Sequence, residues 1–461
     1  MIDDQVHDAD HFDHDEDSTA NSRQLNWMPF LFGIFFLLLN FQTITYLGLE
    51  KEDLESTKLQ DSQIRYYHFF SLVFALPLMR WLPSLRLPWP AILYFVSAIG
   101  TALLASYVNK HFSGRNLTLV FAAYSLLLGL YFARIMSPQK LEKYVRVLFL
   151  WFSIAVFAKL FYYLAISGGG LPRNEGGRPN ITFFSAGGNN LEVTWLALSS
   201  VFFVTRLSFY PVAANCVLMS SLYLSRVGLI VVGAAAVFKF LRVRPVVSLL
   251  VLGVTGPLLA ILLATTVNWS SSEVVERFLN IGDKEEYGSQ SRLEIWIATI
   301  DAIRAKPWGY GVGSGMEEVK DILTQTVHQN NVHNIFLQMV LDCGVHTLIC
   351  FLILVFHVAR TWYLNGAKNP FGTFFLLFLL PGLIEFTGQE SLVWMFVGMF
   401  YGTVKAEEEQ QALADDEYEE EQPDDEVVAE ASPDEGSNSE SAANEASTEE
   451  ETPAALAEKV N

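Results

Sequence analysis

One histidine and two arginines stand at positions where such side chains are unusual. His333, followed by Asn334, opens an apolar run that extends to about residue 360. Arg226 falls between two apolar stretches, where a charge costs about 2.5–3.5 kcal/mol on insertion scales, and Arg292 lies upstream of His333. Imidazole exchanges protons near neutral pH, and guanidinium offers paired donors that fit phosphate oxygens. Taken alone, His333 is more readily explained as a structural residue at an interface.

The composition indicates which elements must position these residues. The chain has 461 residues, 51% of them hydrophobic, and many apolar stretches approach the roughly 20 residues that cross a bilayer as a helix. This predicts an all-α polytopic membrane protein with about twelve transmembrane helices and a helical extracytoplasmic loop, and it excludes a soluble globular protein. The predicted spans are 27–48, 67–86, 89–108, 116–135, 144–167, 190–208, 209–225, 228–242, 246–267, 333–360, 369–387 and 389–404.

The distribution of basic residues predicts the orientation. With the N-terminus inside, the short inner segments hold 13 Lys and Arg residues and the short outer loops hold eight, so both termini are expected in the cytoplasm. The outer loop then leads directly to His333 at the outer membrane surface. The predicted organisation is an acidic leader (1–26), nine transmembrane helices (27–267), an extracytoplasmic loop (268–332), three transmembrane helices (333–404) and a disordered cytoplasmic tail (405–461).

The formal net charge of -20 describes the tail rather than the whole chain. Residues 407–461 contain 21 Asp and Glu against a single Lys, which alone accounts for -20. Such a segment buries too little apolar surface to fold by itself, which is why the tail is predicted to be disordered.

The outer loop contains a predicted amphipathic helix. The stretch "SQSRLEIWIATIDAIRAKPWGYGVGSG" (289–315) is expected to begin at a capping Ser289 or Ser291 and to stop before Pro307. We expect it on the membrane surface or against the bundle, and an ordinary loop helix with a snorkelling Arg292 is the alternative. Five residues at helical spacing predict its apolar stripe: Leu293, Trp296, Ile297, Ile300 and Ile303.

The four alternating glycines from Gly309 to Gly315 do not form a dinucleotide-binding fingerprint. They permit either a tight backbone path or the close approach of a ligand.

In combination, these residues resemble the signature of the O-antigen ligase and polymerase family. Its pieces are Arg292, Trp296, Pro307, the glycines, and "HNIFLQMVLDCG" from His333 to Gly344. "LYLSRVGLIVVG" (222–233) and "RPNITFFSAGGNNLEVTWLAL" (178–198) are similar to two further family segments, so the resemblance spans roughly residues 170 to 400.

This resemblance implies a metal-independent and cofactor-free glycosyltransferase in the bacterial cytoplasmic (inner) membrane. It would move a glycan from a polyprenyl (undecaprenyl) diphosphate carrier to a hydroxyl of a glycan or lipid-core acceptor, in surface polysaccharide biosynthesis. His333 is then the expected general base, and Arg226, Arg292, Arg178 and Asn334 the expected diphosphate- or substrate-binding residues. The expected partners are these substrates and membrane lipids, with no nucleic acid.

Several alternatives stay open at this point. A transporter or flippase of lipid-linked glycans would also have many spans and buried charges, although residues 27–225 and 228–404 show no internal repeat. A ligase, a polymerase and a protein O-glycosylating enzyme share the motif. The remaining intramembrane acids either pair with the arginines, bind sugar hydroxyls or bridge helices: Glu192, Asp342, Glu385 and Glu390.

Overall fold

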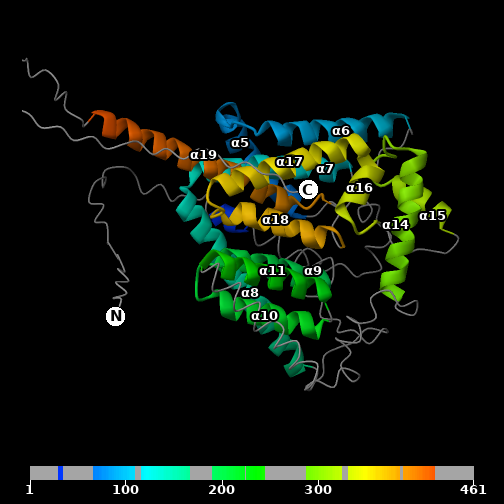
Figure 1. Cartoon of the computed structure of the whole chain (residues 1–461), viewed down its shortest axis with the longest axis horizontal. Coiled ribbons are helices and arrows are strands. Elements are labelled where there is room, and N and C mark those ends of the chain that lie inside the picture. Colours follow the sequence, from blue (N-terminus) through cyan, green and yellow to red (C-terminus); the bar gives the residue numbers. More distant parts are fainter. Residues whose placement is uncertain are drawn as a thin grey trace, which may run out of the picture. The chain divides into compact units, whose positions relative to one another are not determined.

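The computed structural model describes residues 30–34, 66–108, 116–166, 189–223, 225–243, 287–323, 331–384 and 388–420. Every regular element in these ranges is a helix (Figure 1), which confirms the predicted all-α class. The chain divides into one unit from Met1 to Gln410 and another from Gln411 to Asn461, and the predicted site residues belong to the first.

The first long helices agree well with the predicted spans. α6 (Trp89–Val108) and α7 (Asn116–Ile135) have the predicted bounds. α8 (Pro138–Ile166) begins earlier than predicted, at a proline whose fixed φ suits the first helical position. The predicted span 67–86 is instead a series of short helices: α4 (Tyr66–Ser71), η2 (Leu72–Phe74), α5 (Ala75–Trp81) and η3 (Leu82–Ser84).

The helices from residue 189 to residue 243 pack together and include Arg226. They are α9 (Asn189–Ser199), η4 (Ser200–Phe203), α10 (Phe209–Leu222) and α11 (Arg226–Val243). α11 packs against α9, α10 and α18 (Pro370–Gly382). Of the predicted span 27–48 the structure describes only residues 30–34, and the predicted span 246–267 lies outside the described residues.

The C-terminal half departs from the prediction in two places. The predicted span 333–360 is two helices, α16 (Ile335–Cys343) and α17 (Val345–Leu364), which are separated at Gly344. α19 (Ser391–Glu420) continues into the tail that was predicted to be disordered from residue 405. Glu, Ala and Gln dominate this continuation and favour helix, and Glu409 pairs with both Arg134 and Lys405.

The outer-loop segment forms two helices, α14 (Tyr287–Ala305) and α15 (Gly315–Ile322), which pack against each other. α14 ends before Pro307, as predicted, but it starts upstream of both serines that were expected to cap it.

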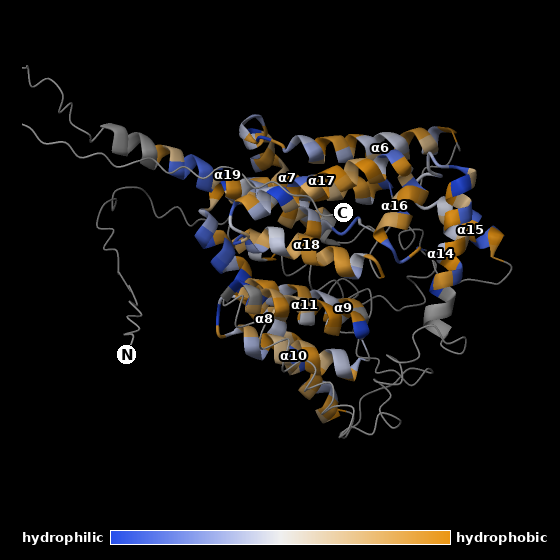
Figure 2. Cartoon of the chain, in the orientation of Figure 1, coloured by the Kyte–Doolittle hydropathy of each residue, from blue (hydrophilic) through white to orange (hydrophobic). Residues whose placement is uncertain are grey.

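Four described helices are long and apolar enough to cross a membrane: α6, α7, α8 and α17. Figure 2 shows hydrophobic residues along most of α6, α17 and α18, whereas α14 and α15 carry both hydrophobic and hydrophilic residues. The structure therefore has the apolar helices of a membrane protein, and the number twelve stays a prediction.

Close backbone contact joins α7 to α19. A Cβ on Gly129 would collide with the carbonyl of Met395, and a Cβ on Gly398 would collide with that of Leu126. Small residues at such crossings let helices approach where lipid supplies no hydrophobic drive between them. Next to this contact, the buried Trp394 of α19 stacks on Tyr94 of α6 with ring centroids 4.9 Å apart.

Candidate functional site

The predicted site residues lie at helix starts or one turn inside a helix. His333 immediately precedes α16, Arg226 is the first residue of α11, and Arg292 lies in α14. All three side chains are half-buried. Arg178 lies outside the described residues.

His333 has an unusual backbone conformation. Its φ is 54°, and among the described non-glycine residues only His333 and Ala367 have a positive φ. This left-handed conformation costs roughly 1–3 kcal/mol for such a residue and persists only where the surroundings enforce it. Strain of this kind is concentrated at functional sites, which makes the contacts on either side of His333 informative.

Two side chains hold the residue before His333. Trp296 of α14 donates its indole N–H to the carbonyl oxygen of Val332, 3.0 Å away. The N–H of Val332 donates to the side-chain oxygen of Gln338, 2.8 Å away. Because both backbone polar groups of Val332 are bonded, the backbone that leads into His333 is held by α14 and by α16.

Asn334, the residue after His333, caps the start of α16. Its side-chain oxygen accepts from the N–H groups of Phe336 and Leu337, each at 3.0 Å, which is an N-cap. Its amide donates to the carbonyl oxygen of Leu383 at the end of α18, 3.0 Å away. The structure thus gives Asn334 a structural task, and its predicted contact with substrate stays a prediction.

A buried polar row continues below the cap along α16. Asn334, Gln338 and Asp342 recur at four-residue spacing and are 8%, 3% and 2% exposed. Gln338 donates to Asp342 at 2.8 Å, and Asp342 also accepts from the N–H of Gly313. These contacts give Asp342 a structural task at the end of α16, and its pairing with an arginine or a sugar stays a prediction.

The glycine segment closes the other end of α16. Tyr310 and Gly311 donate their N–H groups to the carbonyl oxygens of Leu341 and Asp342, at 2.8 and 2.9 Å. Gly309, Gly311 and Gly313 all have positive φ, and a Cβ on Gly309 would stand 2.7 Å from the nitrogen of Gly344. Of the two explanations open from the sequence, the tight backbone path is therefore the one that these contacts support.

The same contacts explain why the predicted long span is broken. Gly344 has φ 86°, and a Cβ there would stand 2.6 Å from the carbonyl oxygen of Trp308. Val345 donates its N–H to the carbonyl oxygen of Pro307 at 3.0 Å rather than to its own helix. The outer-loop backbone thus occupies the place where one continuous helix would pass.

The buried face of α14 differs from the predicted stripe. Ile295, Ala298 and Ala302 are buried in a small core that includes Val332 and Leu341. Leu293, Ile297 and Ile300 of the predicted stripe are instead exposed. Apolar residues on two faces of the helix made the sequence pattern ambiguous. An outward apolar row is compatible with the predicted position at a membrane surface.

Arg292 and Trp296 are one helical turn apart on α14, so Arg292 is near the helix face that contacts the peptide before His333. Arg226 is linked to the same region less directly. α11 packs against α18, whose C-cap residue Leu383 accepts the bond from Asn334. The contacts of α14 therefore bring Arg292 to the neighbourhood of His333, and a place for Arg226 beside them stays a prediction.

A buried ion pair joins α8 to α9, upstream of Arg226 in the sequence. Lys159 of α8 pairs with Glu192 of α9, with side chains 1% and 2% exposed. The hydroxyl of Tyr223, just upstream of Arg226, donates to the same carboxylate at 3.5 Å. Glu192 was expected as a possible partner for the arginines. Lys159 was missed, because a lysine inside an apolar run can equally extend toward the membrane surface.

Two further acidic residues were candidates from the sequence, Glu390 and Glu385. Glu390 accepts a hydrogen bond from the N–H of Gly388 at 2.9 Å, near the start of α19. Glu385 lies outside the described residues.

Comparison with known proteins identifies the segment that contains this site. Residues 212–352 match the family model described as O-antigen ligase, and this range includes Arg226, Arg292 and His333 together with Trp296, Gln338 and Asp342. No curated protein matches the chain significantly. The segment from residue 212 to residue 352 is therefore similar to the O-antigen ligase family, in agreement with the family resemblance predicted from the sequence.

Proposed function

We propose that this protein transfers a glycan from a polyprenyl diphosphate carrier to an acceptor hydroxyl at the outer face of a bacterial cytoplasmic membrane. The observation that carries the proposal is the family match over a segment in which Trp296, Gln338 and Asn334 hold the strained peptide of His333. A side chain maintained in this way is suited to a task that needs one fixed position.

In the proposed reaction, His333 accepts the proton of the acceptor hydroxyl. The hydroxyl oxygen forms a bond to the anomeric carbon of the donor sugar, and the bond from that carbon to the diphosphate oxygen breaks. Arg226 and Arg292, with Arg178 as a further candidate, neutralise the negative charge that develops on the departing polyprenyl diphosphate. No step of this scheme uses a metal ion or a cofactor.

Replacing Arg226 or Arg292 by lysine is expected to weaken donor binding by roughly tenfold, because lysine keeps the charge but loses the paired donors. The measurement is glycan transfer by the purified protein in liposomes, with a polyprenyl-diphosphate glycan as donor and with EDTA present. Arg304→Lys is a matched control, because Arg304 lies on α14 with an exposed side chain that pairs with Asp301. Equal effects of all three substitutions would contradict the diphosphate assignment, and loss of wild-type activity in EDTA would contradict the metal-free scheme.

The chemical nature of the acceptor distinguishes the three glycan transfer reactions that remain open. A lipid-core acceptor would make the protein a ligase, a second carrier-linked glycan would make it a polymerase, and a protein acceptor would make it an O-glycosylating enzyme. Supplying the three acceptors separately in the same assay identifies which reaction takes place.

The proposed site requires a specific topology: twelve spans, both termini in the cytoplasm, and residues 268–332 outside. A reporter fused after Asn280 is expected to behave as extracytoplasmic and one fused after Lys405 as cytoplasmic, because basic residues are concentrated in the inner segments. Alkaline phosphatase and a fluorescent protein that folds only in the cytoplasm provide the two readouts. If both fusions report the same side, the topology and the outer location of His333 are wrong.

A further inference from the structure

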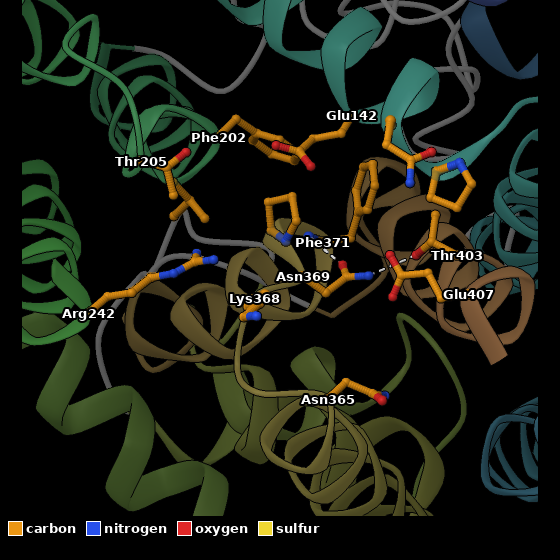
Figure 3. Close-up of a pocket in the computed structure, with 14 residues that line it drawn as sticks. Glu142, Phe202, Thr205, Arg242, Asn365, Lys368, Asn369, Phe371, Thr403 and Glu407 are labelled. Carbon is orange, nitrogen blue, oxygen red and sulfur yellow. Dashed lines mark hydrogen bonds between the residues drawn. The ribbon is translucent and has the colours of Figure 1, made fainter. Parts of the chain in front are cut away.

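A polar pocket lies at the opposite end of α18 from His333. Asn369, Pro370 and Phe371 at the start of α18 line it, whereas Leu383 at the other end of α18 bonds to Asn334 beside His333. The remaining walls come from the start of α8, η4, the end of α11, the turn after α17, and α19 (Figure 3). Its volume of about 450 Å³ falls in the range of small-molecule sites, about 300–1,000 Å³.

Four charged side chains line this pocket, two of each sign: Arg242, Lys368, Glu142 and Glu407. In Figure 3, Arg242 and Lys368 approach the same region, and Glu142 and Glu407 lie across from it. Within the described residues, Arg242, Lys368 and Glu407 make no ion pair, whereas Glu142 pairs with Arg146. The four lining charges sum to zero, but because Glu142 is paired with Arg146, Glu407 is the carboxylate that the lining leaves opposite Arg242 and Lys368.

Glu407 lies close enough to Glu142 for the two carboxyl groups to repel each other. Desolvation of its carboxyl raises the pKa of Glu407, and the neighbouring Glu142 carboxylate raises it further. A bound cation between these two groups would reduce this repulsion. On the basic side, Arg242 and Lys368 together suit a phosphate group.

The surroundings of the pocket favour a lipid over a water-soluble molecule. Tyr363 and Leu364, which directly precede the lining residue Asn365, are 74% and 62% exposed. Phe240, two residues before Arg242, is also exposed. Apolar side chains thus continue from the rim of the pocket along the outsides of α17 and α11, where acyl chains would lie. Pockets with basic residues between transmembrane helices are a common kind of lipid headgroup site.

We propose that this pocket binds the headgroup of a glycerophospholipid that carries both a phosphate and a primary ammonium, as in phosphatidylethanolamine. Arg242 and Lys368 bind the phosphate, and Glu407 with Glu142 binds the ammonium. The Glu407 carboxylate, which makes no ion pair among the described residues, selects a headgroup with an ammonium over one that is only anionic. The proposal is independent of His333 and of the transfer reaction.

The test uses the full-length protein in phosphatidylcholine nanodiscs to which a second lipid is added. Phosphatidylethanolamine is expected to raise the thermal unfolding temperature and to remain bound in native mass spectrometry, with phosphatidylglycerol less effective. Arg242→Gln, Lys368→Gln and Glu407→Gln are each expected to weaken this binding about tenfold, because each removes one charge-assisted contact. Lys143→Gln and Glu408→Gln, at exposed neighbouring positions outside the pocket lining, are expected to leave it unchanged.

Three results would overturn the proposal. A stronger effect of phosphatidylglycerol would make this an anionic-lipid site, and competition by free phosphoethanolamine would make the ligand water-soluble. Equal losses in the pocket variants and the controls would show that no specific site is present. Where a variant fails to fold, the wild-type protein with successively N-methylated phosphatidylethanolamine gives the same test. Binding must then weaken with each methyl group, since each removes a donor to the carboxylates.

Discussion

His333→Ala is expected to lower the turnover of glycan transfer by about 10²–10⁴, the usual loss when a general base is removed. Binding of the donor should change little, because its diphosphate is assigned to the arginines. The measurement is the single-turnover rate with saturating donor in liposomes, together with the Kd of the donor.

The left-handed backbone at His333 calls for a second variant. Asn tolerates this conformation better than most residues, so His333→Asn removes the imidazole while it keeps the peptide geometry. It should be as slow as His333→Ala. His357→Gln is the matched control, because His357 lies in α17 and bonds to Tyr401. Normal turnover in correctly inserted His333→Asn protein would show that His333 is not the base.

Lys159→Met is expected to destabilise the protein by about 3–5 kcal/mol, since it leaves the buried Glu192 without Lys159. Loss of one partner is far more harmful than loss of both, because the remaining charge has been removed from water. The measurement is the midpoint of thermal or denaturant unfolding in detergent, at constant protein and detergent concentrations.

The double variant Lys159→Met with Glu192→Met separates this explanation from a simple packing defect. It should recover much of the stability that Lys159→Met loses, because neither charge of this pair remains. Lys140→Met provides the control, since Lys140 is an exposed lysine at the other end of the same helix. If the double variant is as unstable as the sum of the single variants, the ion pair is not the cause.

The local sequence was enough to predict the bounds of helices that are not interrupted by contacts from other segments. The apolar runs that became α6 and α7 end at polar residues, and both helices have the predicted bounds. The run from residue 333 to residue 360 is just as apolar, but it breaks at Gly344 because the backbone of Trp308 packs against it. No periodicity within the run carries that information, since the cause lies in a different segment.

The same limit applies to the site. His333 and Arg292 were found through residue type and motif, and Trp296 was part of that motif. Its contact with Val332, however, depends on the way α14 lies against α16. Gln338 carried a usable signal that was overlooked, because Asn334, Gln338 and Asp342 recur at the spacing that aligns side chains along one helix face.

The glycine segment has a consequence for how a long glycan could enter. Three backbone hydrogen bonds attach residues 307–311 to residues 341–345 and hold this stretch against the end of α16. An opening motion that bends the chain at the glycines would break all three bonds. A hinge that admits the proposed substrate would therefore lie outside this stretch, because Gly309 and Gly311, despite their conformational freedom, stand where the backbone is bonded to the end of α16 and the start of α17.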